Sequence, residues 1–209
     1  MWHSQNLGVA FTYGLRYNDN GLWRKIGKLW DEYKRMLHMN QNLLILGAGI
    51  YGLVAKEIAE SMNCFSRIAF VDDAATKAAD GSHVIGTSKD LSSLSKEYQY
   101  AVVAIGNAAV RLSLLKRIGE ETQLNIATLI SPYAYTSPSA KLGAGCIVEP
   151  MAVIHAGCVI EDGCIISAGA VVNHGSCCEK AVHVDCNATV KGFATVPAGT
   201  KVNSGTVFA

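Results

Sequence analysis

The sequence has few charged residues and almost no net charge. Only 17% of its 209 residues are Asp, Glu, Lys or Arg, the formal net charge is +1, and residues 131–209 contain no arginine. Such a chain lacks the basic surface that nucleic acid requires, so nucleic acid is not an expected partner. Half of the residues are hydrophobic, so the chain can still build a substantial core.

Long hydrophobic runs are also missing. No apolar run approaches the roughly 20 residues of a membrane span, and no secretory signal is visible. The chain has seven cysteines, an odd number, and six of them lie within residues 131–209. Both observations favour a cytoplasmic location, where thiols stay reduced.

What the sequence does contain is a repeat with a period of six. Every sixth residue from Leu142 is apolar: Leu142, Val148, Ile154, Ile160, Ile166, Val172, Cys178, Val184, Val190, Val196, Val202 and Phe208. The residue two places before each is no larger than Cys or Thr, except Val182. This pattern indicates a solenoid of stacked short parallel strands, because each coil must place the same residue type above the coil below. The large residue should point into a narrow core, with the small residue near a corner.

Residues 42–130 instead alternate strands with helices. We expect strands at Leu43–Leu46, Arg67–Val71, Ser82–Ile85 (weak), Tyr100–Ile105 and Asn125–Leu129, and helices at Leu53–Met62, Asp90–Glu97 and Ala108–Ile118. This order predicts a small parallel α/β unit. Pro132 and Pro138 mark its junction with the repeat.

Residues 1–41 are expected to form an N-terminal extension that contains a helix. Leu22–Leu37 has an apolar face and many basic residues, which favours a helix that packs on the domain or on a partner subunit. A membrane-surface helix is an alternative. Met39 stands directly before the first clear strand, so residues 1–38 could be an upstream extension.

A glycine-rich turn follows the first strand. Gly47-Ala48-Gly49-Ile50-Tyr51-Gly52 matches G-x-G-x-x-G between a strand and a helix. Such glycines let the backbone approach a phosphate, and the helix N-terminus attracts its charge. Asp72, twenty residues beyond Gly52, could accept hydrogen bonds from ribose. The turn favours a nucleotide without specifying NAD, and a tight turn without a ligand is the alternative.

The six-residue repeat resembles that of left-handed parallel β-helices. A small Rossmann-like unit followed by this repeat resembles the bacterial sugar acetyltransferases of the PglD/NeuD type, over about Leu43 to Gly205. The motifs that carry the resemblance are the glycine turn, Val71-Asp72-Asp73, Ala104-Ile105-Gly106-Asn107 with Arg111, Ser137-Pro138-Ser139-Ala140, and Val171-Val172-Asn173-His174.

The resemblance implies a fold, a reaction and an assembly. Residues 42–130 would be a Rossmann-like nucleotide-sugar-binding domain, and residues 131–209 a left-handed β-helix acyltransferase domain. The implied reaction transfers acetyl from acetyl-CoA to a UDP-linked amino sugar or a sialic-acid-like sugar. Members assemble as homotrimers with CoA between adjacent β-helices.

The resemblance also implies substrate-binding residues. Gly49, Tyr51 and Gly52 would line the phosphates and the sugar, and Asp72 and Asp73 would meet the uridine or ribose. The residues that would close the site are Gly106, Asn107 and Arg111. The family commonly has histidine where this chain has Tyr51, and a tyrosine cannot carry positive charge.

His174 matches the catalytic histidine of the family. An amine or hydroxyl must lose a proton as it attacks the thioester carbon, and histidine suits that role as general base in direct transfer. A lone surface histidine would otherwise be inert. The family then usually has an acidic residue, where this chain has Gly175. Glu179, Asp185 or a carboxylate from a neighbouring subunit could supply it.

His183 matches a position that contacts acetyl-CoA, and Ser204 would touch it from a later coil. One alternative is a non-catalytic nucleotide-sugar-binding or assembly protein, which Gly175, Tyr51 and the end at Ala209 favour. Another is a small NAD(P)-binding regulator. A zinc site is a further alternative, with the candidate ligands His174, Cys177, Cys178, His183 and Cys186. The phase of the repeat disfavours it, because Cys178 should point inward and His174 outward.

Overall fold

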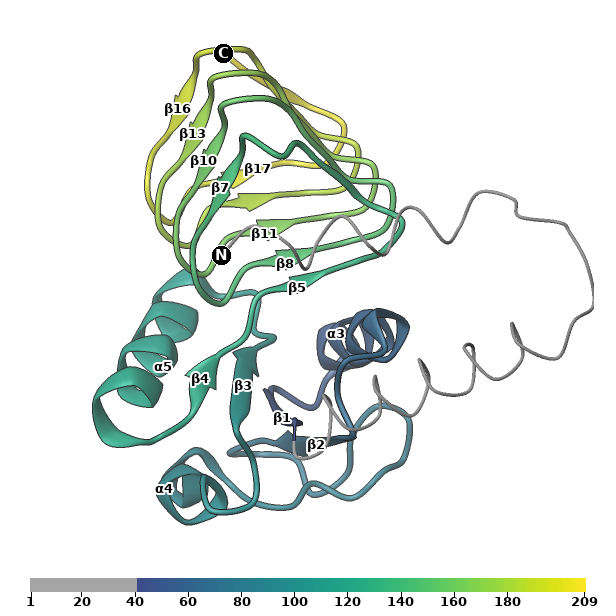
Figure 1. Ribbon diagram of the computed structural model, residues 1–209, viewed down its shortest axis with the longest axis vertical. Helices are drawn as coiled ribbons and strands as arrows, with labels where there is room; N and C mark the ends of the chain where they lie inside the picture. The colour runs from purple at the N-terminus through teal and green to yellow at the C-terminus, as the bar shows by residue number, and fades with distance from the viewer. Residues whose placement is uncertain (1–40) are drawn as a thin grey trace, which may run out of the picture. The chain divides into compact units, whose positions relative to one another are not determined.

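The computed structural model describes residues 41–209, in which an α/β part is followed by a β-helix (Figure 1). These residues belong to one compact unit, Asn40–Ala209. The helix expected at Leu22–Leu37 lies outside the described residues. No helix in the described part of the chain is long and apolar enough to cross a membrane.

The α/β part is a parallel four-stranded sheet in the order β2-β1-β3-β4. Its strands are β1 (Asn42–Leu46), β2 (Arg67–Val71), β3 (Tyr100–Val103) and β4 (Asn125–Ile126). Its helices are α3 (Ile50–Met62), the 3₁₀ turn η1 (Ser88–Asp90), α4 (Leu91–Leu94) and α5 (Ala108–Glu121). Alternate residues of β1 lie in two different core clusters. Both faces of the sheet are therefore covered, as the continuous apolar sequence of β1 requires.

Two of the expected strands differ from the structure. Ser82–Ile85 is no strand: it makes only isolated bridges, Val84 to Phe70 and His83 to Lys77. The stretch Asn125–Leu129 is divided. Its first two residues form β4, whereas Leu129 begins β5 (Leu129–Ile130), which pairs with a strand of the repeat.

The repeat folds as a left-handed parallel β-helix with three faces, as predicted. The first face contains β5, β8 (Ile147–Val148), β11 (Ile165–Ile166), β14 (His183–Val184) and β17 (Lys201–Val202). The second contains β6 (Tyr135–Thr136), β9 (Val153–Ile154), β12 (Val171–Val172), β15 (Thr189–Val190) and β18 (Val207–Phe208). The third contains β7 (Lys141–Leu142), β10 (Val159–Ile160), β13 (Cys177–Cys178) and β16 (Thr195–Val196). Paired strands lie 18 residues apart, as Val159 and Cys177 do, so one coil is three sides of six residues.

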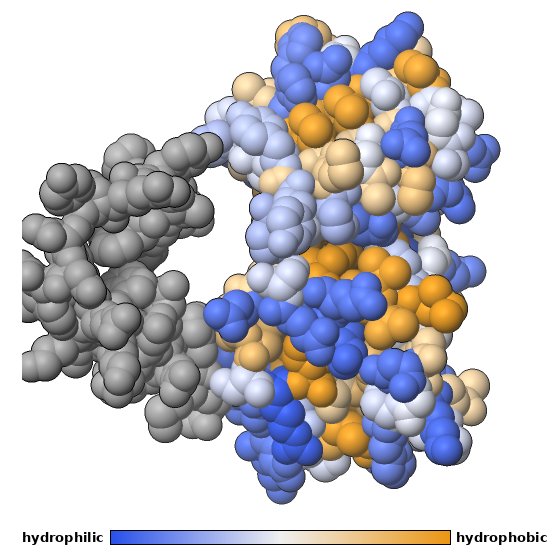
Figure 2. All heavy atoms as spheres, turned by 90° about the vertical axis from the view of Figure 1, so that its right-hand side faces the viewer, coloured by the Kyte–Doolittle hydropathy of each residue, from blue (hydrophilic) through white to orange (hydrophobic). Residues whose placement is uncertain are grey.

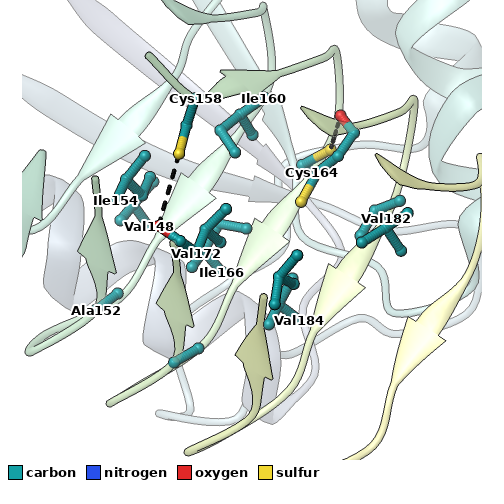
Figure 3. Packing of buried hydrophobic residues seen from close by; sticks show 14 of the residues in the cluster. Val148, Ala152, Ile154, Cys158, Ile160, Cys164, Ile166, Val172, Val182 and Val184 are labelled. Carbon is teal, nitrogen blue, oxygen red and sulfur yellow. Dashed lines mark hydrogen bonds between the residues drawn. The ribbon is translucent and has the colours of Figure 1, made fainter. Parts of the chain in front are cut away.

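The predicted core ladder is confirmed. The large residues from Val148 to Val202 and most of the small residues form one buried cluster, and Figure 3 shows their side chains pointing toward one another. Cys158 and Cys164 occupy small-residue positions and are completely buried. Their thiols lie 3.0 Å and 3.1 Å from the carbonyl oxygens of Asn173 and Glu179. These cysteines are therefore packing residues.

The α/β part covers the first face of the β-helix. Helix α3 lies against β5 (Figure 1), and the outward residues Ile147 and Ile165 of this face are fully buried. The second face keeps exposed apolar residues: Tyr135 is 57% exposed and Val207 62%. In Figure 2, apolar residues likewise emerge among hydrophilic ones over the upper part of the molecule, which is the β-helix.

Candidate active site

His174 lies in the turn after β12, at the corner between the second and third faces. The turn forms because Val172 and Ser176 point into the core while Gly175 takes a φ of +66°. The backbone of Asn173 is held in the stack, donating to Val190 O and accepting from the Ser176 amide. The exposed imidazole of His174 therefore stands on a well-anchored corner.

Asn173 contacts the imidazole through one side-chain oxygen. Its Oδ1 accepts a hydrogen bond from the His174 backbone N–H at 2.9 Å and lies 2.8 Å from His174 Nδ1. Sequence reasoning named Asn173 as part of a motif but gave it no role.

The next coil supplies two further neighbours of His174. The ring of Phe193 meets the imidazole edge-on, with centroids 5.1 Å apart and planes at 86°. Gly192 lies beside the other edge, where a Cβ would stand 3.0 Å from His174 Nε2. Both were missed, although the 18-residue coil places residue 192 beside residue 174 and residue 193 beside residue 175.

The carboxylates proposed to assist His174 have other partners in the structure. Glu179 Oε2 accepts a hydrogen bond from the Ala198 amide, and Asp185 forms a 2.9 Å ion pair with Lys201. A role for either carboxylate at His174 stays a prediction. The side-chain acceptor observed at the His174 ring is the amide oxygen of Asn173.

His183 lies on β14, next to the last strand of the first face. Its Nε2 lies 3.0 Å from Ser167 Oγ and 3.8 Å from the Asp185 carboxylate. Burial lowers the pKa of His183, although the Asp185 charge opposes this, so the ring is neutral at pH 7. Ser204 is exposed after β17, and its hydroxyl donates to Cys186 O at 2.7 Å.

The glycine turn connects β1 to α3. Gly47 has a φ of +108°, and Gly52 must lack a side chain because a Cβ there would overlap Gly47 O. Gly49 is the N-cap residue of α3 and is exposed. The turn thus presents the open N-terminus of a 13-residue helix to solvent, as anion binding requires.

The two aspartates after β2 hold backbone in place. Asp72 accepts hydrogen bonds from the amide of Ala48 in the glycine turn at 2.8 Å, and from the amides of Ala74 and Ala75. Burial alone would raise the pKa of Asp72, but these amides outweigh it and lower the pKa. Asp73 accepts from the amide and hydroxyl of Ser88. Contacts of either aspartate with a nucleotide stay a prediction.

Gly106 and Asn107 follow β3, which is adjacent and parallel to β1. Asn107 caps α5, its Oδ1 accepting from the Val110 amide at 3.0 Å. Because the strand order changes direction between β1 and β3, the crevice outside their carboxyl ends is where ligands bind in such sheets. The exposed residues Gly49, Gly106 and Asn107 all lie at this edge.

Arg111 does not close this crevice, contrary to our expectation. It is completely buried, and its guanidinium donates to four carbonyl oxygens, those of Ile105, Gly106, Gly163 and Ala181. Two of these acceptors belong to the β-helix, so Arg111 ties α5 to it. Burial lowers the pKa of Arg111 from its usual value.

Tyr51 also faces inward. Its hydroxyl is buried and has no hydrogen-bond partner within residues 41–209. Burial, and then the nearby Glu149 carboxylate, raise the pKa of Tyr51 well above its usual value. In this structure Tyr51 therefore packs between α3 and the β-helix rather than lining an open phosphate site.

One chain thus brings some predicted residues together and separates others. The glycine turn, Gly106 and Asn107 lie on the side of the first face, where His183 also lies. His174 is at the corner opposite that face, nine residues or half a coil from His183. Within the described residues, no three His, Cys, Asp or Glu side chains are placed to hold a metal ion.

These features define a class by its fold: a small parallel α/β unit followed by a left-handed β-helix of hexapeptide repeats. Residues 42–118 match the PglD N-terminal domain, and residues 139–174 match the bacterial transferase hexapeptide family. A comparison with curated protein sequences gave no match.

Two solved structures are similar over most of the chain. The acetyltransferase domain of PglB from Neisseria gonorrhoeae is 30% identical, with a TM-score of 0.73 over 81% of this chain and 92% of that one, and it has also been solved with acetyl coenzyme A. A histidine-to-asparagine mutant of perosamine N-acetyltransferase from Caulobacter crescentus, in complex with CoA and GDP-perosamine, is 25% identical, with a TM-score of 0.64 over 80% and 88%. The chain belongs to the PglD-type family of hexapeptide-repeat sugar acetyltransferases.

Proposed function

We propose that the chain transfers an acetyl group from acetyl-CoA to the amino group of a nucleotide-linked amino sugar. The observation that carries the proposal is the exposed imidazole of His174, held at the corner of the β-helix by Asn173. The similar proteins support the substrates: one is solved with acetyl coenzyme A and another with CoA and GDP-perosamine. We assign sugar binding to residues 42–130 and acyl transfer to residues 131–209.

In the proposed reaction His174 acts as general base. The sugar amine attacks the thioester carbon while His174 Nε2 accepts the proton that the nitrogen must lose. The carbon–sulfur bond then breaks, and CoA leaves as a thiolate that takes up a proton. The acetyl group passes directly to nitrogen, with no acyl-enzyme. His183 and Ser204 are proposed to contact acetyl-CoA.

We propose that a homotrimer completes the site. His174 lies at the corner opposite the face that carries His183 and the α/β part, so a second copy must bring the base to the sugar and the CoA. The second face leads to this corner and carries exposed apolar residues, as do its two margins. Tyr133 and Met151 on one margin are 75% and 74% exposed, and Phe193 beside His174 is 78% exposed. Burial of such residues drives association.

The experiment is an acetylation assay with acetyl-CoA and a panel of UDP- and GDP-linked amino sugars, read by mass spectrometry of the sugar. We expect a mass gain of one acetyl group with the wild type. His174→Ala should abolish turnover with an unchanged melting temperature, and His83→Ala, an exposed histidine of the α/β part, should stay active. Retained activity in His174→Ala would remove that residue from its role. No thermal shift with millimolar acetyl-CoA would instead favour a non-catalytic binding protein.

A further inference from the structure

The side-chain oxygen of Asn173 contacts both the backbone N–H and the ring of His174. This double contact determines which ring nitrogen of His174 carries a hydrogen. The backbone N–H of His174 can only donate, so the Asn173 atom that it meets must be the oxygen Oδ1. The same oxygen lies 2.8 Å from Nδ1. An oxygen without hydrogen cannot donate, so Nδ1 must carry the hydrogen, and Nε2 of the neutral ring holds the free electron pair.

This arrangement supplies an acceptor to His174 in a chain that has Gly175 where the family usually has an acid. An acidic residue beside a catalytic histidine holds the ring in one tautomer, and an acid at residue 175 would be strained in this chain. Gly175 has a φ of +66°, which L side chains rarely adopt, and a Cβ there would stand 2.7 Å from two ring atoms of Phe193. The acceptor for Nδ1 comes instead from the residue before the histidine.

We infer that Asn173 is the positioning residue of His174, fixing the Nδ1–H tautomer so that Nε2 faces the reacting amine. The inference rests on the proposed function, since it takes His174 as the base. Asn173 orients the ring without adding a negative charge, unlike an acid. The titratable groups on the flanking coils are His155 and Lys191, which are in register with Asn173.

The side chain of Asn173 can be changed without removing the turn. The turn depends on Asn173 backbone groups: the amide donates to Val190 O, and the carbonyl accepts from the Ser176 amide and hydroxyl. Asn173→Ala removes only the side-chain acceptor. Asn173→Asp keeps an acceptor oxygen in the same place and adds charge.

The first test measures the tautomer itself on the full chain, by ¹H–¹⁵N NMR of the histidine rings. The signals of His174 are assigned as those that disappear in His174→Ala. We expect Nδ1–H in the wild type and in Asn173→Asp, and the Nε2–H form that water favours in Asn173→Ala. Asn203→Ala is the matched control, because Asn203 follows β17 as Asn173 follows β12. An unchanged Nδ1–H tautomer in Asn173→Ala would overturn the inference.

The second test is kinetic. In Asn173→Ala we expect kcat to fall about 10- to 100-fold with KM little changed, within the range of a misplaced base. Asn173→Asp should restore kcat and move the acid limb of the pH profile to higher pH, because its carboxylate stabilises the imidazolium. Wild-type kcat in Asn173→Ala would overturn the inference and leave the proposed function standing. A wild type that acetylates no sugar would remove the proposed function, while NMR still decides the tautomer.

Discussion

Gly192 lies against the ring of His174, such that a Cβ at residue 192 would stand 3.0 Å from Nε2 and 3.2 Å from Cε1. Gly192 is not one of the residues with positive φ, so alanine fits its backbone. The reacting nitrogen is therefore approachable on this side only because residue 192 has no side chain.

Gly192→Ala should consequently lower kcat by about 10- to 100-fold, the size of effect expected when a reacting group is displaced. The melting temperature should hardly change. Gly119→Ala in α5 is the control, because its Cβ would meet nothing closer than Ile126 Cδ1 at 4.0 Å. It should keep full activity and gain about 0.5–1 kcal/mol of stability. Normal kcat in Gly192→Ala would show that the amine does not approach from this side.

Gly175 and Phe193 should prove energetically coupled. Gly175→Ala forces a side chain into a left-handed conformation, which costs about 1–2 kcal/mol, and presses its Cβ onto the Phe193 ring. In a Phe193→Ala background only the first cost remains. Urea unfolding of the double-mutant cycle should give a coupling of at least about 0.5 kcal/mol. Strictly additive free energies would mean that the ring moves away without cost.

Arg111→Met should destabilise the protein by about 3 kcal/mol or more, because the substitution removes a buried guanidinium and leaves four carbonyl groups without their donor. Arg111→Lys should recover part of this loss, since an ammonium group has fewer donors. Urea unfolding measures the stability, and KM for the sugar is measured in parallel. Unchanged stability with a raised KM would restore the substrate-closing role that the sequence suggested.

Asp72 should make the fold sensitive to acid. Its pKa in the folded protein lies below the usual value, so its stabilising contribution is present above about pH 4. The contribution is lost as the pH falls through the lowered pKa. Asp72→Asn should be less stable at pH 7 and show a weaker loss between pH 4 and lower values, measured by thermal unfolding across pH.

Asp73→Asn is the control, because it removes the same charge from the neighbouring position. If Asp73→Asn loses as much acid sensitivity as Asp72→Asn does, the acid sensitivity comes from the total charge of the protein. The hydrogen bond to the glycine turn would then contribute little.

Much of the fold could be predicted because its signals are local. The stretch Arg67–Val71 was expected as a strand and is β2 with the same bounds. The stretch Ser82–Ile85 has strand-like residues but finds no continuous partner, and pairing partners are a tertiary property. Leu129 was assigned to the α/β sheet because nothing in its residue type distinguishes the last strand of one sheet from the first strand of the next.

The site was harder to predict than the fold. The position of His174 on the outside follows from counting two residues past Val172. The burial of Arg111 and Tyr51 does not follow from any local pattern, because it depends on the packing of α3 and α5 on the β-helix. The role of Asn173 depends on a single rotamer, which residue type alone does not specify.

The six-residue period by itself determined that the repeat forms a solenoid of stacked parallel strands, and which side chains fill it. It could do so because every coil must meet the same packing requirement, which repeats in the residue types. Only the tertiary structure decided what surrounds His174. Its neighbours Gly192 and Phe193 come from the next coil, and its acceptor Asn173 is placed by a turn whose geometry depends on Gly175. Stacking places residues that are 18 positions apart side by side, so the surroundings of His174 depend on the register of neighbouring coils.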